Sequence, residues 1–92
     1  MIAPIPPTGC RYKVLTADGQ VKDGPGILVG ILCTTSSSLV LDVYDNTALS
    51  GTKIVDDLPM DAKEFQEIPA QCDTGIYVDF ASGTGTITVF FI

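Results

Sequence analysis

The fold is decided by the stretch Gly75-Ile76-Tyr77-Val78-Asp79-Phe80-Ala81, Ser82-Gly83-Thr84-Gly85, Thr86-Ile87-Thr88-Val89-Phe90-Phe91-Ile92. In its first part, apolar side chains alternate with Tyr77 and Asp79, which is the period of two of a half-buried strand. The middle part consists of small residues with two glycines, which favour a tight turn. The last part is rich in the β-branched and aromatic residues that strands prefer. The pattern predicts a β-hairpin of two short strands.

The end of this stretch is apolar on both of its faces. If Ile87, Val89 and Phe91 face the core, then Phe90 and Ile92 face outward. Within a monomer, a second sheet or the N-terminal segment could cover these outward side chains. The alternative is a subunit interface, because contiguous apolar patches on soluble proteins usually mark contacts.

The rest of the chain has strand patterns separated by turn signals. The segment 35–37 is predicted to be a turn, and the segment 56–63 has no alternation and leaves room for one helical turn. About seven short strands at this spacing predict an all-β protein, a single antiparallel β-sandwich that is jelly-roll-like. The sandwich domain is expected at residues 11–92, after an extended Pro-rich arm at residues 1–10. Besides the C-terminal stretch, strands are expected at residues 11–16, 21–22, 27–34, 39–45, 52–55 and 64–68.

Composition and charge exclude several classes of partner. Eleven acidic residues against five basic ones give a net charge of −6, and the basic residues are scattered. We therefore expect no nucleic-acid partner and no attraction to an anionic membrane. The longest apolar run, Ile27–Cys33, is too short to span a bilayer as a helix. The N-terminus lacks the pattern of a signal peptide, so we expect synthesis in a cytoplasm, with release, if any, by lysis.

The three cysteines are few, odd in number and without a CxxC spacing. This is unlike the dense, even set of a secreted disulfide scaffold. We predict that Cys33 and Cys72 act as small buried apolar residues. A reactive or metal-binding thiol is the alternative, although the chain has no histidine to serve as its usual partner.

Catalytic patterns are missing from the sequence. There is no histidine to act as a general base, no GxSxG elbow, no P-loop and no dinucleotide-binding glycine motif. The glycines of Gly83-Thr84-Gly85 lie between two predicted strands, so they are assigned to a turn. We therefore expect a protein that is not an enzyme, with no catalytic residue, no metal site and no cofactor.

One acidic cluster raises a calcium hypothesis. Asp56, Asp57, Asp61 and Glu64 lie close together in the sequence, and hard cations prefer several carboxylate oxygens on one loop. The spacing lacks the alternation and the central glycine of an EF-hand. The favoured interpretation is a solvated acidic loop, and whether the segment Asp56–Glu64 binds a cation is left open.

The candidate functional residues are those expected to contact other subunits. The alternation that places Leu41 and Val43 in the core places Val40 and Tyr44 on the outer face. The Pro-rich arm is expected to be either loose or laid across a neighbouring subunit. The predicted interface residues are Pro4, Ile5, Pro6, Pro7, Val40, Tyr44, Phe90 and Ile92.

The motifs of this chain resemble those of the small β-sandwich virion proteins of tailed bacteriophages, such as capsid decoration or cement proteins. The similarity spans residues 26–92, about three-quarters of the chain. It rests on Gly26-Ile27-Leu28-Val29-Gly30-Ile31, Leu39-Val40-Leu41, Val43-Tyr44-Asp45-Asn46, Ser50-Gly51-Thr52-Lys53-Ile54, Gly75-Ile76-Tyr77-Val78 and Gly83-Thr84-Gly85-Thr86-Ile87-Thr88-Val89.

The resemblance implies a jelly-roll-like fold, a homo-oligomer such as a homotrimer, and stabilisation of a phage head by binding the major capsid protein. The expected location is the virion, after synthesis in the host cytoplasm. Two other functions stay open: a tail or head–tail connector subunit, and a ligand-binding β-sandwich module for sugar or peptide.

Overall fold

The computed structural model describes residues 10–92, and this part of the chain is built from β-strands. Residues 10–92 contain no helix with the length and hydropathy that a bilayer crossing demands. Two of the strands are much longer than the others. The strands are β1 (Arg11–Leu15), β2 (Gly19–Asp23), β3 (Gly26–Asp45), β4 (Thr52–Met60), β5 (Phe65–Cys72) and β6 (Gly75–Phe91).

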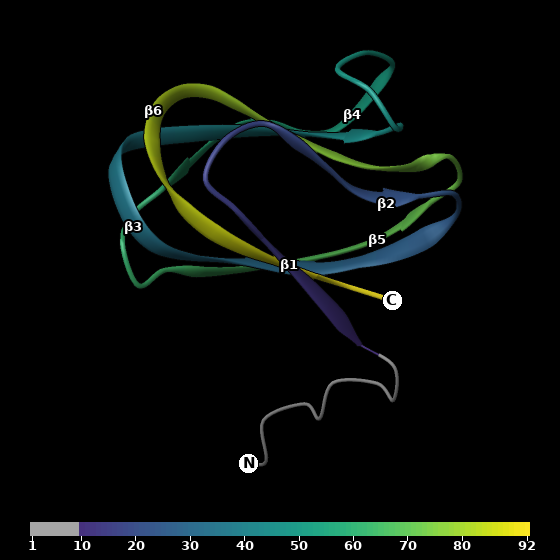
Figure 1. The fold of residues 1–92 in the computed structure, drawn as a ribbon, viewed down its shortest axis with the longest axis horizontal. Coiled ribbons are helices and arrows are strands. Elements are labelled where there is room, and N and C mark those ends of the chain that lie inside the picture. The colour runs from purple at the N-terminus through teal and green to yellow at the C-terminus, as the bar shows by residue number, and fades with distance from the viewer. Residues whose placement is uncertain (1–9) are drawn as a thin grey trace.

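The long strands β3 and β6 lie side by side in antiparallel register along most of their length, from the Leu28–Phe91 pair to the Tyr44–Tyr77 pair. Both strands curve back on themselves at one end of the molecule, on the left in Figure 1. The first half of β3 pairs with β5 and the second half with β4, while β1 and β2 pair with the two halves of β6.

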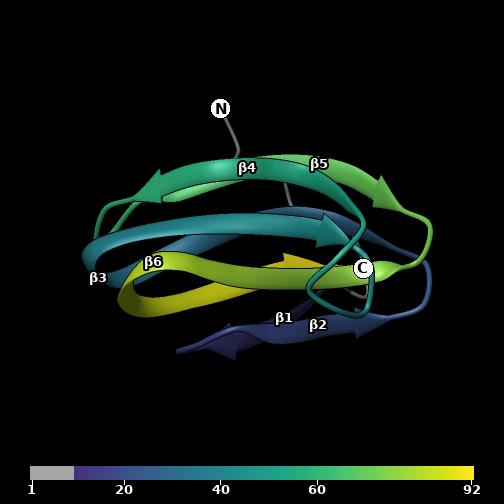
Figure 2. The same cartoon turned by 90° about the horizontal axis from the view of Figure 1, so that it is seen from above.

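The curved pair divides the sheet into two four-stranded layers. Their strand orders are β1-β6-β3-β5 and β2-β6-β3-β4. Figure 2 shows this common order from above, with β4 and β5 at one edge of the molecule and β1 and β2 at the other. Two packed four-stranded layers are the architecture of a jelly roll, so the predicted all-β, jelly-roll-like sandwich is confirmed.

The bend is made by small residues in unusual backbone conformations. Ser38 has a φ of 55° and Gly83 a φ of 73°, and both lie where the register between β3 and β6 shifts. A Cβ at Gly83 would collide with the backbone carbonyl of Ser38. The Ser36 hydroxyl donates a 2.6 Å hydrogen bond to the carbonyl of Met60, which ties the bend to the end of β4. Short side chains therefore let the two strands turn the corner together.

The core lies between the two layers. The inward side chains of the paired strands are fully buried in alternation, as expected for a period of two. Fully buried apolar residues come from both halves of each long strand, and Met60 and Cys72 close the core from β4 and β5. From β3 and β6 they are Leu28, Ile31, Cys33, Leu39, Leu41, Val43, Ile76, Val78, Ile87 and Val89.

Several local predictions are wrong, although the fold class is right. The two halves of the C-terminal stretch form one strand, β6, and each half pairs with β3 rather than with the other half. The predicted turn at 35–37 is part of β3, and the segment 56–60 belongs to β4. Strand β5 continues through Pro69 to Cys72. Six strands replace the predicted seven because small residues in bulges bend a strand without ending it.

The predicted interface residues Pro4, Ile5, Pro6 and Pro7 lie outside the residues that the structure describes.

Candidate functional site: two contrasting outer faces

The outer face of the β1-β6-β3-β5 layer is apolar, and we call it the apolar face. Register and alternation place two rows of side chains across it. One row runs Tyr12, Phe90, Gly30 and Glu67, and the other runs Val14, Thr88, Leu32 and Phe65. Tyr12 is 69% exposed, Val14 52% and Phe65 49%, so these large side chains meet solvent instead of the core.

Aromatic rings form a band across the apolar face. Tyr12 and Phe90 are direct cross-strand partners. The rings of Phe90 and Phe65 meet edge to face, with centroids 6.2 Å apart and planes at 67°. A Cβ at Gly30 would lie 2.6 Å from the Phe65 ring, so the absence of a side chain at Gly30 allows this ring to lie across β3. The band therefore spans all four strands of the layer. Patches of this kind usually mark protein contacts.

The predicted interface residues of the described chain do not lie together. Phe90 is half-buried in the aromatic band, and Ile92 lies just after the end of β6. Val40 and Tyr44 lie on the outer face of the other layer. Tyr44 is only 9% exposed, because the side chain of Lys53 lies over its ring with Nζ 5.8 Å from the centroid. Tyr44 is therefore covered by its own chain.

The outer face of the β2-β6-β3-β4 layer is acidic, with Asp42 near its centre. Asp42 is 5% exposed and lies opposite Asp79 of β6. Its Oδ1 accepts a 2.7 Å hydrogen bond from the amide of Asp57, and its Oδ2 lies 3.3 Å from Nζ of Lys53. The pKa of Asp42 is lowered, chiefly by the Asp57 hydrogen bond and further by Lys53, against the opposing effect of burial.

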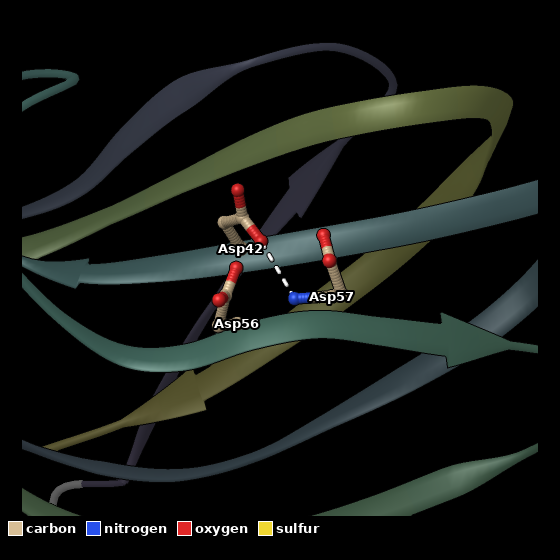
Figure 3. A group of neighbouring side chains, drawn as sticks. All are labelled: Asp42, Asp56 and Asp57. Carbon is tan, nitrogen blue, oxygen red and sulfur yellow. Dashed lines mark hydrogen bonds between the residues drawn. The ribbon is translucent and has the colours of Figure 1, made fainter.

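Lys53 joins two of the carboxylates of this face. Its Nζ lies 3.0 Å from Oδ1 of Asp56 as well as near Asp42, and these contacts raise the pKa of Lys53. Carboxylate oxygens of Asp42, Asp56 and Asp57 lie within 4.8 Å of one another. Figure 3 shows the three side chains gathered where β3 and β4 run side by side. Such a set of oxygens suits a hard cation. Here the Lys53 ammonium and the Asp57 amide already satisfy both oxygens of Asp42.

The acidic cluster predicted from the sequence is divided in space. Asp56 and Asp57 join Asp42, which is distant in the sequence, whereas Asp61 and Glu64 lie outside that group. The amide of Asp61 donates a 3.2 Å hydrogen bond to the Glu64 side chain in the turn between β4 and β5. The predicted acidic loop is therefore two separate groups in the structure. Asp56 and Asp57 lie beside Asp42 on β3, whereas Asp61 and Glu64 lie in the turn between β4 and β5.

A second pair of carboxyl groups lies on the acidic face. The pKa of Asp79 is raised, first by burial and then by the neighbouring Asp18 carboxyl. Oδ1 of Asp18 accepts a 2.7 Å hydrogen bond from the amide of Phe80, which ties the β1–β2 turn to β6. A carboxyl that is half-buried beside another carboxyl favours its neutral form.

The prediction that Cys33 and Cys72 are small buried apolar residues is confirmed. Both side chains are fully buried, and burial is the main cause of the raised pKa of each thiol. Cys10 is half-buried and also free. A thiol with a raised pKa is a poor nucleophile, so neither buried cysteine offers catalytic chemistry.

Sequence reasoning missed Tyr12, Phe65 and Asp42 as members of these faces. Tyr12 and Phe65 belong to short strands that are far apart in the sequence, β1 and β5, and only pairing with β6 and β3 brings them to one face. Asp42 lies between the buried Leu41 and Val43, so alternation places it on the outer face, but its contact with Asp57 depends on the register of β3 and β4. Alternation within a strand gives the face of a residue but not its neighbours.

Comparisons with protein families, with curated proteins and with solved structures find no match to this chain.

Proposed function

We propose that this chain is a structural subunit of a phage virion, a decoration or cement protein that binds the major capsid protein as a homo-oligomer. The observation that carries the proposal is the apolar face, with its band of Tyr12, Phe90 and Phe65. Aromatic residues are enriched at the centres of protein interfaces. The jelly-roll-like fold and the sequence resemblance agree with this role, although a fold by itself does not specify a function.

In this role the protein acts by binding and not by reaction. A ligand that binds only the assembled shell stabilises the shell by mass action, with a gain that grows as the logarithm of ligand concentration over Kd. At about 100 times Kd the gain is roughly 2.7 kcal/mol for each site. The apolar face would supply the contact with the shell, because burying it removes several exposed large side chains from water.

The test uses heads of the virus whose genome encodes this chain, prepared without the protein. The purified protein is mixed with these heads, which are then pelleted, and bound protein is quantified against protein added. Val14→Asp places a charge on the apolar face and is expected to lower the affinity by roughly tenfold or more, since it leaves a charge desolvated in the contact. Leu49→Asp is the matched control, since Leu49 is 51% exposed in the β3–β4 loop and Val14 is 52% exposed.

Saturable binding to heads that Val14→Asp weakens and Leu49→Asp leaves unchanged supports the proposal. Failure of the wild-type protein to bind heads would contradict it. Binding to purified tails in the same assay would favour a tail or connector subunit instead.

A further inference from the structure

The apolar face stays open over residues 10–92. Tyr12, Val14 and Phe65 meet solvent there, and the second layer packs against the opposite, inner side of this layer, where the core lies. The sequence indicated two ways to cover such side chains within the monomer: a second sheet, or the N-terminal segment, residues 1–9. The second sheet is therefore excluded as the cover, and the N-terminal segment is the candidate that remains.

A second apolar row lies beside the aromatic band. Ile27 and Ile92 are direct partners, because the amide of each donates to the carbonyl of the other, at 3.1 and 2.8 Å. Their chain neighbours Leu28 and Phe91 point into the core, so alternation turns Ile27 and Ile92 to the apolar face. Ile27 is 43% exposed and Ile92 is half-buried. We call these two residues the isoleucine pair, and it lies next to the aromatic band on the same face.

The N-terminal segment is attached beside the isoleucine pair. Arg11 pairs with Phe91 at the start of β1, and continuing this antiparallel register by one residue brings Cys10 to Ile92. Strand β1 is the edge strand of its layer, so a chain that turns just before Cys10 can cross β6, β3 and β5 in that order. Gly9 suits such a turn, because glycine readily adopts a positive φ.

The composition of residues 1–9 matches an apolar and aromatic surface. None of these residues has a charged side chain, and the run Pro4-Ile5-Pro6-Pro7 holds three prolines and one isoleucine. Proline-rich runs favour the polyproline II helix. Segments of this kind bind against aromatic side chains, because a preformed helix has little conformational freedom to lose. The aromatic band and the isoleucine pair offer such a surface within reach of the run.

The length of the segment fits the width of the face. Polyproline II rises about 3.1 Å per residue, so residues 4–8 span about 15 Å in this conformation. The four strands of the layer lie about 4.8 Å apart, which gives about 14 Å from β1 to β5. A short tether also holds the segment at an effective concentration in the millimolar range. At micromolar protein, its own face is therefore favoured over the face of another copy.

We propose that residues 4–7 lie across the apolar face of their own chain, along the isoleucine pair and toward β5, with Ile5 over the β3–β5 side of the face. The segment shields the isoleucine pair and one flank of the aromatic band from water. Any partner of the apolar face has to displace it, so the apparent Kd exceeds the intrinsic Kd by the inverse of the uncovered fraction. Only the application of this last point to a phage shell rests on the proposed function.

The test uses the full chain with a nitroxide spin label and NMR spectroscopy. Ala3→Cys in a Cys10→Ser background provides the labelling site, because Cys33 and Cys72 are buried thiols with raised pKa values. The label is expected to broaden the amide signals of β5 most strongly, since residues 4–7 carry it across the face to that strand. A solvated segment would keep the label closest, on average, to the strand that it precedes, so the signals of β1 would lose the most intensity.

Two variants of the spin-labelled protein separate docking from mere proximity. Ile5→Asp is expected to release the segment and to restore the β5 signals, because a carboxylate would have to lose water on the apolar surface. Ile2→Asp is the matched control: it makes the same exchange of side chain outside residues 4–7, and the β5 signals should stay broadened. Mixing the spin-labelled protein with isotope-labelled protein that carries no nitroxide should cause no broadening.

Strongest broadening in β1, no recovery in Ile5→Asp, or equal recovery in Ile2→Asp would overturn the inference. Broadening between molecules would overturn it too, because the segment would then reach the face of another copy. All of these measurements use the free protein without heads. A failure here therefore leaves the shell-binding assay standing, and failure of the wild-type protein to bind heads leaves this contact within the chain standing.

Discussion

The backbone amide of Asp57 donates a 2.7 Å hydrogen bond to Oδ1 of Asp42, so a nearly buried carboxylate on β3 holds the bulged part of β4 in place. Asp57 itself has a φ of 55°, in the left-handed region. The register between β3 and β4 shifts near this point. The hydrogen bond therefore compensates for the interrupted backbone pairing between β3 and β4 at this point. Lys53 balances the negative charge of the Asp42 carboxylate.

Asp42→Ala is expected to lower the free energy of unfolding by about 1.5–3 kcal/mol, the usual cost of losing a hydrogen bond to a charged partner and leaving a donor unpaired. The measurement is urea unfolding at pH 7 followed by far-UV circular dichroism. Asp23→Ala is the control, because Asp23 is exposed on β2. Equal effects of the two changes would show that the Asp57 contact is not stabilising.

The same carboxylate makes stability depend on pH. The pKa values of Asp42 and Asp45 are both lower in the folded protein than in the unfolded chain. For Asp45 the cause is a set of hydrogen bonds that its carboxylate accepts from the backbone amides of Thr74, Asp73 and Gly75. Their stabilising effect is complete above the unfolded pKa of about 3.9 and is lost as pH falls through the folded values. The free energy of unfolding, measured between pH 6 and pH 2, should therefore decrease toward the acid end of this range. The decrease should be less steep in the Asp42→Asn variant than in the wild-type protein.

Asp79 is expected to act in the opposite direction. Its raised pKa means that the folded protein binds this proton more tightly than the unfolded chain does, so ionised Asp79 destabilises the fold near neutral pH. Asp79→Asn should therefore raise the unfolding temperature at pH 7, by a few degrees. The gain should shrink as pH falls through the folded pKa, where the wild-type carboxyl is already neutral. Destabilisation at pH 7 would contradict this account.

Gly83→Ala tests the bend of the long strands. The φ of 73° is unfavourable for alanine, and the new Cβ would collide with the carbonyl of Ser38. The left-handed conformation alone costs roughly 1–2 kcal/mol, and the collision adds to it. Gly24→Ala is the control, since Gly24 has a φ of 92° but no atom within 4 Å of the added Cβ. Thermal unfolding should show a larger loss for Gly83→Ala.

Thiol labelling tests the burial of the cysteines. In the native protein a disulfide reagent should modify Cys10 rapidly, while Cys33 and Cys72 are protected because both are buried with raised pKa values. In denaturant all three thiols should react at similar rates. Rapid reaction of a second thiol in the folded protein would show that one edge of the core opens readily.

The sequence predicted the class of the fold and the inward faces of the long strands, because alternation is a local property of a strand. Ile76 and Val78 are fully buried as their period of two indicated, and so are Ile87 and Val89. The sequence could not show that Thr35-Ser36-Ser37 and Ser82–Gly85 bend two paired strands. Small residues have the same local signature in a turn and in a bulge, and only pairing between distant segments distinguishes the two.

The members of the site were harder to predict for the same reason. Phe90 was identified from the two-sided apolar end of β6, but its neighbours Tyr12 and Phe65 come from segments more than fifty residues apart in the chain. The grouping of Asp42 with Asp57 likewise follows from register. Sequence patterns give the chemistry of each strand, whereas the composition of a face depends on which strands are neighbours.

The position of β6 between β3 and the pair β1 and β2 has a consequence for the order of events during synthesis. Both layers need β6 as an inner strand, yet β6 follows all the other strands in the chain. Until it has left the ribosome, β1 and β2 have no hydrogen-bonding partner and one side of β3 stays open. A nascent chain therefore carries exposed strand edges until β6 emerges, and during that time aggregation and chaperone binding compete with closure of the sheet.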